Sequence, residues 1–97
     1  MEKDLGHCLI CLRKMYLGSS VDEHHLIPKT FGGKETVTIH RICHQKIHSL
    51  FTERELQKQY HTIEALKTHP EMGKFILWVS KKPPMFYDHN DSLKNKR

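Results

Sequence analysis

The spacing of hydrophobic and polar residues changes near residue 41 and divides the chain into a β-rich part and a helical part. In residues 21–26, Val, Glu and His alternate with Asp, His and Leu, and we interpret this stretch as a strand. Residues 36–39 are short and β-branched and predict a second strand. Pro28, Gly32 and Gly33 interrupt any regular element between them, so we expect a hairpin-like unit around a basic loop.

From residue 41 onward the pattern predicts helices. The first of them has an inner apolar face made of Ile42, Ile47, Leu50 and Phe51. Thr52 and Glu55 have the spacing of a capping box, which places the start of a second helix at Glu53. Thr62 is predicted to cap a third short helix, and Pro70 to occupy the first position of a fourth.

Length and composition limit the organisation of the chain. Its 97 residues, 37% of them hydrophobic, suit one small domain over residues 1–80, with residues 81–97 as a flexible basic tail. We expect residues 1–7 to be loose and residues 12–21 to form a short arm. No secretory signal or membrane-spanning run is evident, which predicts a cytoplasmic, reducing location with no membrane partner.

The three cysteines predict a metal site. Three is an odd number, so a complete disulfide framework is not expected. Cys8 and Cys11 are separated by two residues, as are His40 and Cys43. Two such pairs form a closed four-ligand set of the kind that holds structural zinc. The alternative is two unrelated pairs with Cys43 as a buried apolar thiol.

Histidines are concentrated in residues 22–48, which contain five of the nine in the chain. His44 and His48 stand four apart on the predicted helix, where two imidazoles can bind one ion. The alternative for this pair is an ordinary exposed helix face. His24 and His25 are adjacent on a predicted strand and therefore point to opposite faces, which indicates different roles. One of them would otherwise be a core or supporting histidine.

The order of these residues resembles the HNH endonuclease family, whose core is the ββα-metal fold. The resemblance covers about residues 8–48 and rests on four motifs, Cys8-x-x-Cys11, His24-His25-Leu26-Ile27-Pro28, Gly32-Gly33 and His40-x-x-Cys43-His44-x-x-x-His48. It implies a small α+β domain with a ββα-metal core over about residues 8–50, held together by structural zinc. Residues 52–80 would add C-terminal helices to this core.

The resemblance also implies a role for each matching position. His24, His44 and His48 would bind a catalytic divalent ion, and His25 would be the general base that activates water. Cys8, Cys11, His40 and Cys43 would take the structural zinc positions. The paired histidines followed by H-x-x-x-H are similar to the nuclease domains of colicins.

Two positions depart from the family pattern. His40 stands where the family usually has cysteine, and zinc accepts imidazole readily. The middle asparagine is absent, and Thr36 occupies its place, with Glu35 as the alternative if the strand is one residue longer. Thr36 can hydrogen-bond but has a shorter reach than asparagine. This departure bears on catalytic efficiency more than on the fold.

The expected function is metal-dependent hydrolysis of DNA phosphodiester bonds with low sequence specificity. The formal charge of +5 favours a polyanionic partner, and the predicted DNA contacts are Lys29, Lys34, Arg41 and Lys46. The cofactors would be structural Zn²⁺ and a catalytic Mg²⁺, Mn²⁺, Ni²⁺ or Zn²⁺, with no organic cofactor. Two alternatives remain, a weak or inactive zinc module that binds nucleic acid, and a nuclease subunit of a larger DNA-processing complex. A double-strand cut would favour a homodimer.

Overall fold

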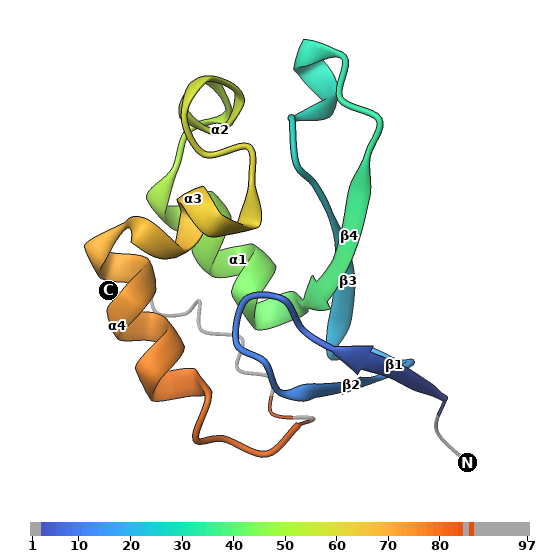
Figure 1. Cartoon of the computed structure of the whole chain (residues 1–97). Coiled ribbons are helices and arrows are strands. Elements are labelled where there is room, and N and C mark those ends of the chain that lie inside the picture. Colours follow the sequence, from blue (N-terminus) through green and yellow to red (C-terminus); the bar gives the residue numbers. More distant parts are fainter. Residues whose placement is uncertain (1–2, 85, 87–97) are drawn as a thin grey trace, which may run out of the picture.

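A computed structural model describes residues 3–84 and 86, which form a small α+β fold (Figure 1). Two antiparallel two-stranded sheets come first, and helices follow. The elements are β1 (Asp4–His7), β2 (Lys14–Tyr16), β3 (Val21–His25), the 3₁₀ turn η1 (Lys29–Phe31), β4 (Thr36–His40), α1 (Arg41–Leu50), α2 (Glu53–Lys58), α3 (Ile63–Thr68) and α4 (Pro70–Val79).

The hairpin of β1 and β2 corrects the expectation of a loose N-terminus, and it places a strand within the expected short arm. The strands are short, and the register shifts between Asp4 and Gly6, where Gly6 has a φ of 87°. This bulge hides the two-residue period that identifies a strand in a sequence. An ion pair of 3.0 Å joins Lys14 to Asp4 across the hairpin, and Met15 is buried beneath it.

The hairpin of β3 and β4 confirms the two strands predicted from alternation and β-branching. Its register pairs Val21 with His40 at one end and His25 with Thr36 at the other. The chain passes from β4 directly into α1, and the Arg41 N–H donates to the Ser20 carbonyl at 2.8 Å. This bond holds the start of α1 against the start of β3.

The predicted helix starts are confirmed. Thr52 accepts a hydrogen bond from the Glu55 N–H, and the Glu55 side chain accepts one from the Thr52 N–H, which completes the capping box. Thr62 caps α3 in the same way by accepting from the Ala65 N–H. Pro70 is the first residue of α4, a position where its missing N–H costs no hydrogen bond.

The helix α1 is central, with the β3–β4 hairpin on one side and α4 on the other (Figure 1). The core therefore draws on both halves of the chain. Its fully buried large side chains are Ile10, Ile39, Ile47, Leu56, Leu66, Met72 and Val79. No helix in the described part of the chain is long and apolar enough to cross a bilayer.

Residues beyond α4 return to both hairpins. The Pro83 carbonyl accepts a hydrogen bond of 2.6 Å from Arg13, and the Pro84 carbonyl lies 2.7 Å from Nε2 of His40. The predicted tail of residues 81–97 thus begins with a segment that contacts the domain. Residues 85 and 87–97 of that tail lie outside the described residues.

Candidate metal centres

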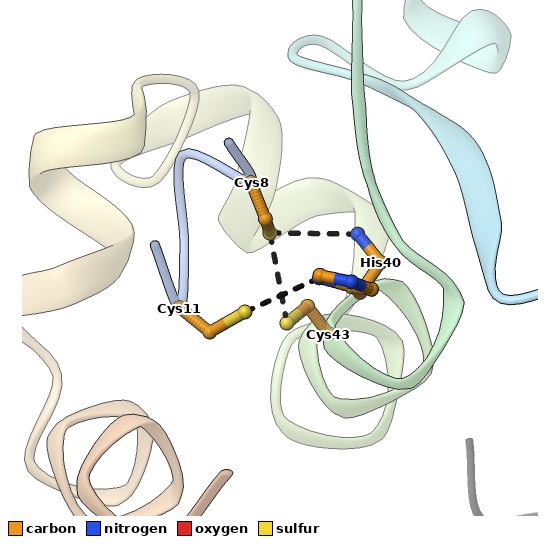
Figure 2. Close-up of side chains that lie close together, drawn as sticks. All are labelled: Cys8, Cys11, His40 and Cys43. Carbon is orange, nitrogen blue, oxygen red and sulfur yellow. Dashed lines mark hydrogen bonds between the residues drawn. The ribbon is translucent and has the colours of Figure 1, made fainter. Parts of the chain in front are cut away.

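Four predicted zinc ligands come together at the junction of the two hairpins (Figure 2). Cys8 and Cys11 lie in the turn between β1 and β2, His40 ends β4, and Cys43 lies in the first turn of α1. The Cys8 N–H donates to the Arg13 carbonyl at 2.9 Å, which closes the turn so that both sulfurs face His40 and Cys43. All four side chains are buried.

The distances within this cluster match those around a tetrahedral zinc ion. Zn–S bonds of about 2.3 Å and Zn–N bonds of about 2.0–2.1 Å place the donor atoms roughly 3.5–3.8 Å apart. The sulfurs of Cys8 and Cys43 are 3.9 Å apart, and Nδ1 of His40 is 3.3 Å from the Cys11 sulfur. All four donor atoms lie within 4.8 Å of one another. The donor set and the geometry therefore fit zinc.

The electrostatics of the cluster favour a thiolate at Cys11. Hydrogen bonds from Cys43 and Cys8 lower the pKa of the Cys11 thiol. The same contacts raise the pKa of Cys43, because it is the partner that keeps its proton. Burial opposes the charged form of His40, but contacts with Cys11 and Cys8 outweigh burial and raise its pKa to about 9. A divalent cation among these groups would replace the shared protons.

Arg13 and the segment after α4 surround this cluster, and the sequence pattern did not point to either. Arg13 is 7% exposed, and its Nε donates to the Cys11 sulfur at 3.3 Å. The Pro84 carbonyl accepts from Nε2–H of His40, which leaves Nδ1 facing the sulfurs. Such outer contacts fix the tautomer of a metal-binding histidine. The sequence offered one signal for this support, which is the position of Arg13 two residues after Cys11.

A second cluster, of three histidines, lies between β3 and α1. His24 comes from β3, and His44 and His48 come from successive turns of α1. Their ring centroids are 4.7–5.7 Å apart, and one nitrogen from each ring lies within 4.8 Å of the others. The predicted helical pair thus meets the first histidine of the predicted strand pair, in an arrangement that can hold one metal ion.

The surroundings of His24 fit a metal-binding imidazole. Its side chain is fully buried, and neither ring nitrogen has a hydrogen-bond partner among the described residues. Burial, together with the nearby His44 and His48, lowers its pKa to about 4, so the ring is neutral at pH 7. Burial likewise lowers the pKa of His48. A neutral imidazole is the form that binds a metal, and a buried polar group without a partner is otherwise costly.

Asp22 supports this cluster, although the motifs did not identify it. Its Oδ2 lies 3.1 Å from Nδ1 of His44, so Nδ1–H donates to the carboxylate and Nε2 remains for a metal. Burial raises the pKa of Asp22, but the bonds from His44 and the Glu23 N–H outweigh it and keep that pKa low. The sequence did contain one signal for Asp22, because the alternation of a strand places it on the same face as His24.

His25 and Thr36 lie directly opposite each other at the end of the hairpin. Cross-strand partners project their side chains to the same face, and neighbours along a strand project to opposite faces. His25 is not one of the three clustered histidines, although it follows His24 directly and ends β3. Glu35 lies one residue beyond the pair, so Thr36 is the residue that faces His25.

The four predicted DNA-binding cations occupy different surroundings. Lys29 and Lys34 are exposed on the loop between β3 and β4. Arg41 begins α1, and its Nε is 4.0 Å from Oδ2 of Asp22. Lys46 lies on the side of α1 that faces α4, with its ammonium 5.9 Å from the centre of the Phe75 ring. Of these four residues, Lys29 and Lys34 are exposed, whereas Arg41 and Lys46 are partly buried.

Comparison with known proteins identifies a bacterial relative. The chain is 36% identical over 81 residues to a Bacillus subtilis (strain 168) protein described as "Uncharacterized protein YisB". The match covers 81% of this chain and 78% of that protein. No family model matches the chain. No solved structure matches it either.

Proposed function

The chain belongs to the family of Bacillus subtilis YisB, and we propose that it is a metal-dependent HNH endonuclease that hydrolyses DNA phosphodiester bonds. The observation that carries the proposal is the environment of His24. A fully buried imidazole near His44 and His48, with no hydrogen-bond partner at either nitrogen within the described part of the chain, has a cost that a bound ion would offset. Three protein ligands leave further coordination positions for water and phosphate oxygens.

The residues divide the work of hydrolysis between them. A divalent ion bound at His24, His44 and His48 would polarise the phosphodiester and stabilise negative charge on the leaving 3′-oxygen. His25 takes a proton from the attacking water as the new P–O bond forms and the bond to the 3′-oxygen breaks. Thr36, opposite His25 on β4, would help to orient that ring. Asp22 fixes His44 in the tautomer that presents Nε2.

The cysteine cluster has the features of a structural site in this proposal. Its four protein ligands are buried and leave no position for a substrate, in contrast to the partly exposed histidine cluster. It connects the β1–β2 turn to the junction of β4 and α1. Zinc at this site would hold α1, and with it His44 and His48, in position against β3.

Contacts to DNA would come mainly from the loop between β3 and β4. Lys29 and Lys34 are exposed there and can neutralise phosphates without reading bases. Arg41 and Lys46 would contribute less, because each lies beside another group of the protein. This arrangement supports binding that depends on salt and tolerates many sequences.

One observation favours a second candidate. Thr36 stands where the HNH pattern has asparagine, so the chain could have kept the fold and lost most of the activity. In that case it would be a zinc-binding module for nucleic acid. The intact set of His24, His25, His44 and His48 weighs against this candidate, because a purely structural module has no need for all four.

Cleavage of supercoiled plasmid tests the proposal directly. Purified protein is incubated with plasmid and Mg²⁺, Mn²⁺, Ni²⁺ or Zn²⁺, with EDTA in parallel. We expect metal-dependent nicking that His25→Ala abolishes and His7→Ala, at an exposed histidine of β1, leaves unchanged. Nicking that persists in the His25→Ala variant would show that His25 is not the general base. Binding of DNA without cleavage in any metal would support the second candidate.

A further inference from the structure

The loop of residues 26–35, between β3 and β4, exposes large apolar side chains close to the proposed active site. Phe31 is 44% exposed and Ile27 is 36% exposed. Phe31 ends the 3₁₀ turn η1, and Gly32 follows it in the left-handed conformation with a φ of 82°. Thr30 donates a hydrogen bond of 2.6 Å to Glu53, which fixes the turn to α2. The exposed Phe31 is thus presented on an anchored loop.

A cavity lies at the base of this loop. Its volume is about 330 Å³, near the lower limit for small-molecule sites. Residues Leu26, Ile27, Lys34, Glu35 and His61 are among those that line it. Gly33 also lines it, and a Cβ there would lie 1.7 Å from the Ile27 carbonyl oxygen. Only glycine therefore allows this close approach of the two sides of the loop.

The cavity begins one residue beyond the proposed catalytic pair. The Leu26 N–H donates to the Glu35 carbonyl at 3.2 Å, which continues the hairpin past His25 and Thr36. A strand advances about 3.3 Å per residue, and a DNA strand about 3.4 Å along the helix axis per nucleotide. If a DNA strand followed the hairpin with its scissile phosphate at His25, a nucleotide one or two steps away would lie at the cavity.

The lining suits a flat, polar-edged ring. Leu26 and Ile27 provide apolar surface, and the exposed Glu35 can accept from an exocyclic amino group, as acidic side chains do from cytosine. Nδ1 of His61 is buried and has no hydrogen-bond partner among the described residues. Lys29 and Lys34 are exposed on either side of the apolar tip and match the charge of the flanking phosphates.

We propose that this loop unstacks one DNA base beside the scissile phosphate, with Phe31 as the wedge, and that the cavity receives the base. Apolar side chains inserted between base pairs are a known way to unstack and kink a duplex. The cost, a few kcal/mol for each unstacked step, would be offset by contacts in the cavity. The inference rests on the proposed function because it takes DNA as the substrate.

Fluorescence of 2-aminopurine tests the proposal separately from cleavage. The His25→Ala chain, with Mn²⁺ present, is titrated with short duplexes that carry one central 2-aminopurine between randomised flanks. Anisotropy of an end label reports binding in the same samples. We expect 2-aminopurine fluorescence to increase on binding, and Phe31→Ala or the cavity-filling His61→Trp to remove at least half of the increase. Leu17→Ala, which removes a 60% exposed leucine outside the loop, is the matched control and should change nothing.

Each outcome has a separate meaning. Binding without a fluorescence increase, or an increase that both loop variants retain, would overturn the proposed unstacking and leave the nuclease proposal intact. Unstacking without plasmid cleavage by the unmodified chain would overturn the nuclease proposal alone. No binding to DNA at all would overturn both, and it would point to a protein partner for the exposed loop.

Discussion

Replacing His24 with leucine should raise the stability of the protein when no ion is bound at the histidine cluster. The same replacement should abolish the further stabilisation that an added ion gives. The ring is fully buried, its pKa of about 4 keeps it neutral at pH 7, and neither nitrogen has a partner among the described residues. A residue kept only for packing would not carry this cost. Leucine has a similar volume and no polar atom, so His24→Leu removes the cost together with the ligand.

The size of the effect follows from the two nitrogens. A buried polar group without a hydrogen bond costs about 1–3 kcal/mol. Removing two such groups should therefore raise the free energy of unfolding by at least about 2 kcal/mol, after some loss to imperfect packing. In a domain of this size that corresponds to a rise in Tm of roughly 10 °C. A divalent ion at 100 times its Kd should stabilise the unmodified protein by about 2.7 kcal/mol, and His24→Leu by nothing.

Thermal unfolding followed by circular dichroism measures both quantities. Zn²⁺ sufficient to fill the proposed cysteine site is present throughout, and Ni²⁺ or Mn²⁺ is added or withheld. Destabilisation of His24→Leu by several kcal/mol without added ion would show that His24 makes native interactions and that the reasoning is wrong. A Tm that still rises with added ion in the variant would show that the ion binds elsewhere.

Three further predictions concern the surroundings of the two clusters. Cys43→Ser should abolish cooperative unfolding and zinc binding, since structural zinc contributes about 10–16 kcal/mol, as much as the whole stability of a small domain; a folded, zinc-free variant would contradict this. Asp22→Asn should weaken metal binding at the histidines by about 10–100-fold in calorimetry, whereas Glu23→Gln, at an exposed position, should not. Arg13→Gln should speed zinc loss to a chromogenic chelator, because three thiolates and Zn²⁺ leave one negative charge that Arg13 offsets; loss at the unmodified rate would refute that role.

The fold was predictable where the sequence contains several residues of one regular pattern. The alternation at residues 21–26, the capping box at Thr52 and the proline at the start of α4 each predicted an element that the structure contains. The β1–β2 hairpin was missed because β2 has only three residues and a bulge interrupts β1. Strands this short are stabilised by the turn and by tertiary contacts, and local periodicity does not record those.

The two clusters of candidate metal ligands were predictable from spacing, but their supporting residues were not. Pairs such as Cys8 and Cys11, or His44 and His48, are close in sequence and therefore close in space. Arg13 contacts Pro83, which is 70 residues away, and Asp22 contacts His44 across the fold. Contacts of that kind depend on how the hairpins and α1 pack together, and no local pattern encodes them.

The most direct test of the central claim separates metal binding from catalysis at His25. Metal affinity is measured by calorimetry and single-turnover DNA cleavage by gel, on the same samples of unmodified protein and His25→Ala. The account predicts one ion bound at the histidines with equal affinity in both, and cleavage slower in the variant by about 100-fold or more. Equal cleavage rates, or no cleavage by the unmodified protein with its ion bound, would contradict the account.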